Sequence, residues 1–155
     1  MTNAEKKYRG NVAAIIVNGS GRLLACRRAD EFHTWQLPQG GIDSGEHLEE
    51  AVLRELREEI GTDAADILFQ LPHAIRYDWP EDFHSRGFHG QEQHYFLLRL
   101  KPAASINLNC QSIPEFDAYE WLTIEEFLPR LSDFKRQAYT QALRELQERF
   151  PELLK

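Results

Sequence analysis

The sequence contains few cysteines and no long hydrophobic run, and both absences exclude classes of protein. Only two of the 155 residues are cysteine, Cys26 and Cys110. They lie far apart and form neither a Cys-x-x-Cys pair nor a zinc-spaced set, so we expect two reduced thiols and no disulfide framework. The longest uninterrupted apolar run, Val12–Val17, is far shorter than the ~20 residues that cross a bilayer, which argues against a membrane-spanning helix.

Export signals and domain boundaries are not evident either. Met1–Gly10 carries several charged side chains with no apolar stretch behind them, so we expect a cytoplasmic protein without a membrane partner. No repeat, low-complexity tract or Gly/Ser linker divides the chain, and we expect one domain over residues 1–155. The net charge of −7 makes a poor non-specific binder of nucleic acid. A nucleotide partner would therefore be held locally, by a few basic side chains or by metal ions.

Strand patterns alternate with helical ones along the chain. Residues 12–17 and 23–28 predict two strands joined as a hairpin by the turn Asn18–Gly21. Further short strands are expected at residues 67–71, 74–77, 94–100 and 120–122, with a loop at 78–91. Strands interrupted by helices favour a layered α/β domain whose sheet is covered on both faces.

Three helices are expected. The first begins at Ser44 or Gly45, runs to Ile60 and ends at Gly61, a residue type that suits a left-handed C-terminal cap. Thr123 and Glu126 form a capping box for a second helix ending near residue 129. The third spans residues 133–150, with apolar side chains at helical spacing, at positions 139, 143, 146 and 150.

The first helix carries an unusual cluster of acidic residues. Its apolar side chains form one wide arc on a helical wheel: Leu48, Ala51, Val52, Leu53, Leu56 and Ile60. Glu55, Glu58 and Glu59 lie along or inside one border of this arc, where like charges repel and desolvation is costly. A solvated glutamate face is the ordinary alternative. A divalent cation with a preference for oxygen ligands, Mg²⁺ first and Mn²⁺ next, would compensate such a cluster.

The segment around this helix resembles the Nudix box. The fixed positions are all matched, by Gly40, Glu46, Arg54, Glu55, Glu58, Glu59 and Gly61, and the one departure is Thr62 in place of an aliphatic residue. The resemblance implies an α/β/α sandwich around a mixed β-sheet and hydrolysis of a nucleoside diphosphate linked to a further group. It also implies that Glu55, Glu58 and Glu59, with the carbonyl of Gly40, hold two or more Mg²⁺ or Mn²⁺ ions. Glu46 and Arg54 would form a structural pair that orients the loop against the helix.

Segments outside the box are similar to the bacterial RNA pyrophosphohydrolases, also known as dinucleoside polyphosphate hydrolases. These segments are residues 8–12, 35–41, 90–93, 114–117 and 134–136, and the departures are Gly10 for proline and Leu37 for phenylalanine. The similarity implies that Glu115 completes the metal set or positions the attacking water. Arg28 and Lys135 would hold 5′ phosphates, and Phe134 would stack on a base. Arg9, Tyr77 and Gln93 are further candidate substrate contacts.

The resemblance implies metal-dependent hydrolysis of the 5′-triphosphate or diphosphate end of RNA. The products would be pyrophosphate or phosphate and a 5′-monophosphate end, a change that would initiate mRNA decay. Diadenosine polyphosphates present the same chemistry, and the sequence does not separate the two substrates. A non-catalytic nucleotide sensor or RNA-binding module is the alternative from another class. Loss of one of Glu55, Glu58 and Glu59 would have favoured that alternative, and all three are present.

Overall fold

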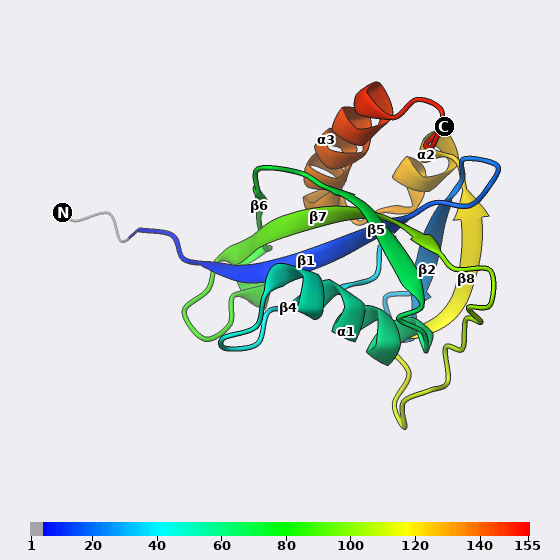
Figure 1. Ribbon diagram of the computed structural model, residues 1–155. Helices are drawn as coiled ribbons and strands as arrows, with labels where there is room; N and C mark the ends of the chain where they lie inside the picture. Colours follow the sequence, from blue (N-terminus) through cyan, green and yellow to red (C-terminus); the bar gives the residue numbers. More distant parts are fainter. Residues whose placement is uncertain (1–4) are drawn as a thin grey trace.

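The computed structural model describes residues 5–155, so the first four residues of the segment examined for an export signal lie outside it. Its strands and helices follow one another as β1 (Tyr8–Ile16), β2 (Leu23–Arg28), β3 (Trp35–Gln36), β4 (Gln39–Gly41), α1 (Leu48–Ile60), β5 (Ala65–Gln70), β6 (Ile75–Asp78), the 3-10 turn η1 (Glu81–Phe83), β7 (Gly90–Leu100), β8 (Phe116–Leu122), α2 (Ile124–Phe127), the 3-10 turn η2 (Leu128–Arg130) and α3 (Asp133–Arg149) (Figure 1).

The strands form one mixed sheet and one small antiparallel sheet. In the mixed sheet the order is β4-β1-β7-β5, and β6 pairs with the first part of β7. Among the described strands of this sheet, β1 and β7 are parallel and the other pairs are antiparallel. The second sheet has the order β3-β2-β8. No helix within residues 5–155 is long and apolar enough to cross a membrane.

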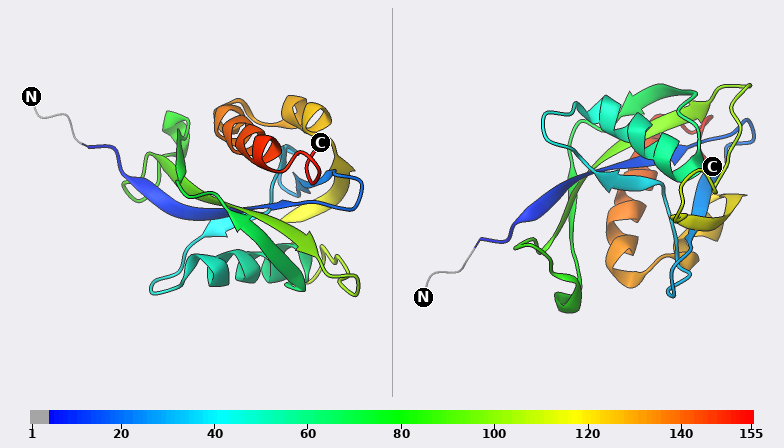
Figure 2. Two further views of the ribbon diagram at one scale, coloured as in Figure 1. Left: turned by 45° about the horizontal axis from the view of Figure 1, so that its top comes forward. Right: turned by 90° about the horizontal axis from the view of Figure 1, so that it is seen from below.

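Helices cover both faces of the mixed sheet, as the sequence predicts (Figure 2). Along β1, Ala13 and Ile15 face a core shared with Tyr139 and Leu143 of α3. Val12, Ala14 and Ile16 point the other way, into a core shared with the apolar side of α1, at positions 51, 52, 56 and 60. The apolar run of β1 is uninterrupted because this strand is buried on both faces. The expected α/β/α sandwich is confirmed.

The predicted hairpin between the first two strands is wrong. The turn itself forms, because the side chain of Asn18 accepts hydrogen bonds from the N–H groups of Ser20 and Arg22, at 3.0 Å each. Beyond one bridge between Val17 and Leu23, however, the two strands separate into different sheets. β1 already pairs with β7 on one edge and with β4 on the other, so no free edge is left for β2.

Several predicted boundaries also change. The first helix begins at Leu48, because Gly45 has a left-handed φ of 76° that a helix cannot contain; its end before Gly61 is as predicted. The expected strands at 94–100 and 120–122 start earlier, at Gly90 and Phe116, and the expected loop is shorter. β3 and β4 were not expected. The capping box of Thr123 and Glu126 and the long last helix are confirmed.

Candidate active site

Two glutamates of α1 face the short strand β4, one of them buried and the other half-buried. The side chain of Glu59 is buried, and one of its carboxylate oxygens accepts a hydrogen bond from the N–H of Gln39 at 2.9 Å. Burial raises the pKa of Glu59 well above its usual range, and the charges of Glu55 and Glu115 raise it further. A carboxylate in this position is unfavourable unless positive charge compensates it.

Glu55 lies directly against Gly40. A Cβ atom at position 40 would lie 2.0 Å from the carboxyl carbon of Glu55 and 2.2 Å from each of its oxygens, so only glycine leaves room for this carboxylate. The side chain is 12% exposed, and Arg54 donates to it at 2.7 Å. Burial raises the pKa of Glu55, and the hydrogen bond from Arg54 partly opposes that shift. Because Gly40 has no side chain, the Glu55 carboxylate can lie directly against the backbone of β4.

Glu58 and Glu115 complete the acidic group from two sides. Glu58 is the most open of the three helix carboxylates, with 45% of its side chain exposed, and Arg54 donates to it at 3.2 Å. Glu115 precedes β8, where its carbonyl accepts a hydrogen bond from the N–H of Ala29 at 2.9 Å. Its charge contributes to the raised pKa of both Glu55 and Glu59, after the larger effect of burial.

The oxygen donors suit a hard divalent cation, although they are not drawn together as a ligand set. In the part of the chain that the structure describes, no three His, Cys, Asp or Glu side chains are gathered closely enough to hold a metal ion as they stand. Arg54 instead compensates Glu55 and Glu58, and the Gln39 N–H compensates Glu59. The raised pKa values of Glu55 and Glu59, which burial and neighbouring negative charges cause, indicate that a cation would stabilise this acidic group.

Arg54 and Glu46 pair as the resemblance to the Nudix box implies. Arg54 donates to both carboxylate oxygens of Glu46, at 2.7 and 2.9 Å, and to the carbonyl of Gly41 at 2.8 Å. Glu46 in turn accepts from the N–H of Asp43 at 2.9 Å. These bonds hold the loop between β4 and α1 against the helix. They lower the pKa of Glu46 to about 2, chiefly through the hydrogen bonds from Arg54.

We expect Glu46→Gln to lower stability in a pH-dependent way. Because the folded-state pKa of Glu46 is lowered from 4.5 to about 2, its contribution is complete above pH 4.5 and is lost as the pH falls toward 2. At pH 7 the variant should be less stable by about 1–2 kcal/mol, and the difference should shrink between pH 5 and 3. Urea unfolding across this range measures it, with Glu50→Gln on the exposed side of α1 as the control. A difference that stays constant with pH would contradict the pairing.

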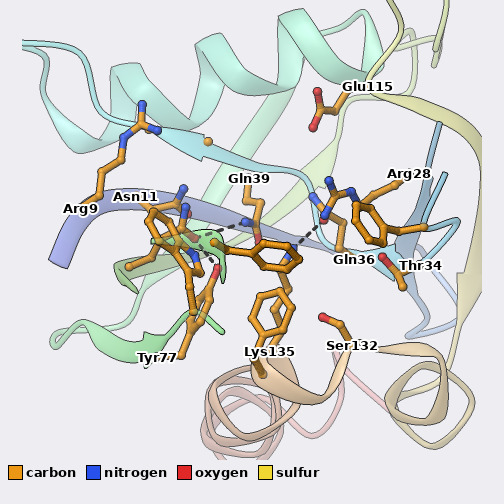
Figure 3. A pocket seen from close by; sticks show the side chains of 17 residues that line it. Arg9, Asn11, Arg28, Thr34, Gln36, Gln39, Tyr77, Glu115, Ser132 and Lys135 are labelled. Atoms are coloured by element: carbon orange, nitrogen blue, oxygen red, sulfur yellow. Dashed lines mark hydrogen bonds between the residues drawn. The ribbon is translucent and has the colours of Figure 1, made fainter. Parts of the chain in front are cut away.

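A cavity of about 430 Å³ opens beside this acidic group. Figure 3 shows Arg9 and Arg28 on either side of Gln39 in its wall. Of the predicted site residues, seven line it: Arg9, Arg28, Gly40, Tyr77, Glu115, Phe134 and Lys135. Glu55, Glu58 and Glu59 are not in the wall; Glu55 and Glu59 adjoin it through Gly40 and Gln39. The cavity thus places cationic and aromatic side chains next to the carboxylates.

Gln93 was expected to touch substrate, and the structure places it beneath the cavity instead. Its side chain is fully buried, and its amide N–H groups donate to Asn11 at 2.8 Å and to Gln39 at 3.1 Å. Tyr95 donates to its carbonyl oxygen. All of its polar atoms are engaged by the protein, so Gln93 supports Gln39 in the floor rather than the substrate itself.

Lys135 is buried at the end of the cavity formed by α3. Its ammonium donates to the side-chain oxygen of Gln36 at 2.7 Å (Figure 3). Burial, together with a smaller effect of the nearby charge of Arg28, lowers the pKa of Lys135 to about 8. Because little negative charge compensates the buried Lys135 ammonium, this position favours an anionic ligand.

The sequence did not identify several cavity residues. Three are amides in the floor or wall, Gln36, Gln39 and Gln91, and three are aromatic residues nearer the mouth, Phe32, Trp79 and Phe83. Alternating glutamines at 91 and 93 are a signal that could have been read as an inward-facing polar stripe of a strand. The aromatic residues lie in loops, and nothing local in the sequence places them together.

Comparison with known proteins agrees with this geometry. A NUDIX domain model matches residues 7–148. The chain belongs to the Nudix family. RNA pyrophosphohydrolases of Campylobacter jejuni subsp. jejuni and Helicobacter pylori strain G27 are 40% and 46% identical to this Nudix protein, over 94% and 89% of its length and 96% and 92% of theirs.

Solved structures show the same fold at lower identity. The dihydroneopterin triphosphate pyrophosphohydrolase of E. coli is 21% identical, with a TM-score of 0.67 over 88% of this chain and 97% of that one. A C. elegans Ap4A hydrolase complex is 18% identical, with a TM-score of 0.66 over 90% of this chain and 98% of that one. At this level of identity the likeness establishes the Nudix architecture alone.

Proposed function

We propose that this Nudix protein hydrolyses the 5′-triphosphate or diphosphate end of RNA, releasing pyrophosphate or phosphate and leaving a 5′-monophosphate. The observation that carries the proposal is the position of Gly40, which lines the cationic cavity and also lies against the Glu55 carboxylate. Phosphates bound in the cavity would therefore adjoin the acidic group. The relatives named RNA pyrophosphohydrolase support RNA as the substrate. Initiation of mRNA decay in the cytoplasm is the role that such a reaction fits.

Nudix hydrolases generally need a divalent metal ion, typically Mg²⁺ or Mn²⁺. In this chain Glu55, Glu58, Glu59 and Glu115, with the Gly40 carbonyl, are the residues that would hold it. A bound ion supplies a Lewis acid for phosphate oxygens and acidifies a water for attack. We further propose that two or more ions are used, since the charges of Glu58 and Glu115 both act on Glu55 and Glu59 and a single ion would leave part of this negative charge uncompensated.

The protein's own cations would bind and orient the substrate. Arg9 lies over Gly41, and a Cβ atom at position 41 would be 2.5 Å from its guanidinium. Arg28 and Lys135 face the cavity from β2 and α3. These three side chains would contact the 5′ phosphates, while Phe134, whose ring lies 6.1 Å from that of Tyr77, would stack on a base. A local cationic cavity explains how a chain with a net charge of −7 accepts a polyanion.

A competition between two substrates tests the proposal. End-labelled 5′-triphosphate RNA and diadenosine tetraphosphate are supplied at equal concentration with Mg²⁺, and the products of each are followed in time. We expect kcat/KM to be higher for the RNA, with pyrophosphate as the released product. A higher kcat/KM for diadenosine tetraphosphate would assign the site to dinucleoside polyphosphates. Binding of both without hydrolysis would favour a nucleotide sensor.

Lys135 gives this site a pH dependence that can be predicted. Above pH 8 the buried amine becomes neutral, so kcat/KM for RNA should fall as the pH rises through about 8. In Lys135→Arg, kcat/KM should no longer fall as the pH rises through 8. Lys135→Met should lower kcat/KM by about 10- to 100-fold at pH 7, the range expected for a hydrogen bond to a charged group.

The stability of the wild type should rise over the pH range in which kcat/KM falls. The unfolded chain binds a proton at Lys135 up to pH 10.5, whereas the folded protein releases it near 8. The wild type therefore gains stability as the pH rises between these values, and Lys135→Met should lack this gain. Melting temperatures taken beside the kinetics check it. An unchanged rate and pH profile in Lys135→Met would remove this residue from the phosphate contacts.

A further inference from the structure

A row of four aromatic rings leads from the cavity to its mouth. Neighbouring ring centroids are 6.1 Å apart at each step, from Tyr77 to Phe134, from Phe134 to Phe83 and from Phe83 to Phe32. The rings come from β6, from the start of α3, from η1 and from the loop after β2. The inner ring, Tyr77, is buried, whereas Phe83 and Phe32 are 46% and 51% exposed. The proposed function involves only the two inner rings, those of Tyr77 and Phe134.

The two outer rings are held in place by their own loops. The N–H of Phe32 donates to the Asp30 carboxylate at 3.1 Å, and the Arg28 guanidinium lies 5.4 Å from the centroid of the Phe32 ring. The N–H of Phe83 donates to the carbonyl of Pro80 at 2.8 Å. Two adjacent phenylalanine rings are thus presented to solvent on fixed backbone, which is unfavourable unless a ligand covers them.

We propose that Phe32 and Phe83 form a stacking site for an unpaired base of the RNA, downstream of the nucleotides held in the cavity. This inference rests on the proposed function. At about 430 Å³ the cavity is near the lower end of the range for small-molecule sites, so an RNA chain must leave it through the mouth. Both rings lie in the wall on that path. Stacking on aromatic rings accepts every base, which suits an enzyme that acts on many transcripts.

The charges beside these rings favour contact through bases rather than phosphates. Asp30 and Glu31 precede Phe32, and Glu81 and Asp82 precede Phe83. The Asp30 carboxylate is paired with the Arg28 guanidinium. The other three carboxylates repel the RNA backbone, so the attraction at the outer rings must come from the faces of the bases. The contribution of this site should therefore depend little on salt, in contrast to that of the buried cation in the cavity.

A series of 5′-triphosphate RNAs of one to six nucleotides, with a common 5′ sequence, tests the site. We expect kcat/KM of the wild type to rise at one length, where a base first reaches Phe32 and Phe83. In Phe83→Ala and Phe83→Leu this rise should shrink about tenfold, since leucine fills space but offers no ring face. Phe83→Trp should keep it, and Phe32→Leu on the opposite loop should repeat the loss. Tyr119→Ala, which removes an exposed aromatic ring outside the cavity wall, should retain the full rise.

Three results would overturn the inference. One is a wild type whose kcat/KM does not depend on RNA length. Another is a Phe83→Leu variant that keeps the full rise. The third is an equal loss at every length together with a lower melting temperature, which would make the rings a packing contact between two loops. Failure of the proposed function is distinct: the wild type would hydrolyse none of the RNAs, and the inference would fall with it.

Discussion

Glu59→Gln is expected to lower the turnover of 5′-triphosphate RNA by about 10²- to 10³-fold, the effect of losing several kcal/mol of metal-ion catalysis. Glutamine keeps the size of the side chain and an oxygen that can accept the hydrogen bond from Gln39. It removes the charge, and with it one ligand of the proposed metal site. The measurement is pyrophosphate release at saturating Mg²⁺, with Glu50→Gln on the exposed side of α1 as the matched control.

The same variant should be more stable than the wild type without metal. Because burial raises the folded-state pKa of Glu59 well above its usual 4.5, the wild type is most stable below pH 4.5 and loses stability as the pH rises from there to the folded-state pKa. Glu59→Gln has no such loss, so its melting temperature at pH 8 should be higher. Mg²⁺ should then raise the melting temperature of the wild type more than that of the variant. A less stable variant that retains a tenth of wild-type turnover would show that Glu59 is a structural residue.

Gly40→Ala is expected to lower turnover by about 10²-fold while leaving the fold intact. The new methyl group would occupy the position of the Glu55 carboxylate, at 2.0 to 2.2 Å from its atoms. The obstructed atoms are the end of a flexible side chain, so the carboxylate can turn away at little cost in stability. We therefore expect a melting temperature close to that of the wild type and a higher Mg²⁺ requirement.

Two comparisons make this prediction specific. Gly19→Ala adds the same methyl group where no atom lies within 4 Å, and it should leave turnover unchanged. On a Glu55→Gln background, Gly40→Ala should cause little further loss, because both changes act on one carboxylate. Full additivity of the two losses, or wild-type turnover in Gly40→Ala, would show that the close contact between these residues has no part in the reaction.

The acidic helix could be predicted from the sequence because its chemistry is local. Spacing along one helix fixes where Glu55, Glu58 and Glu59 lie relative to its apolar face. The structure then shows Glu59 buried, with its carboxylate against the N–H of Gln39, and Glu58 half open. The resemblance places Gly40 with these glutamates, but the contact between Gln39 and Glu59 could not be predicted because the sequence does not indicate the short strand β4 that contains Gln39.

Other elements depend on pairing between distant segments. The sequence predicts that the strand β7 begins at His94, yet it begins at Gly90 and includes the buried Gln91 and Gln93, of which Gln91 lines the cavity and Gln93 lies beneath it. The predicted hairpin is wrong for a similar reason, because the strands that pair with β1 come from distant parts of the sequence. Phe32 and Phe83 are 51 residues apart in the sequence and meet only in the folded protein. Local patterns therefore identify the acidic group of the helix and leave the outer surface of the cavity undetermined.

The most direct test of the central claim is end-group analysis of 5′-triphosphate RNA incubated with the protein, once with Mg²⁺ and once with a chelator. The account predicts one pyrophosphate released and one 5′-monophosphate end formed for each RNA consumed in the presence of Mg²⁺, with neither product formed when the chelator is present. RNA that keeps its triphosphate end with Mg²⁺, or hydrolysis that continues in the chelator, would contradict it.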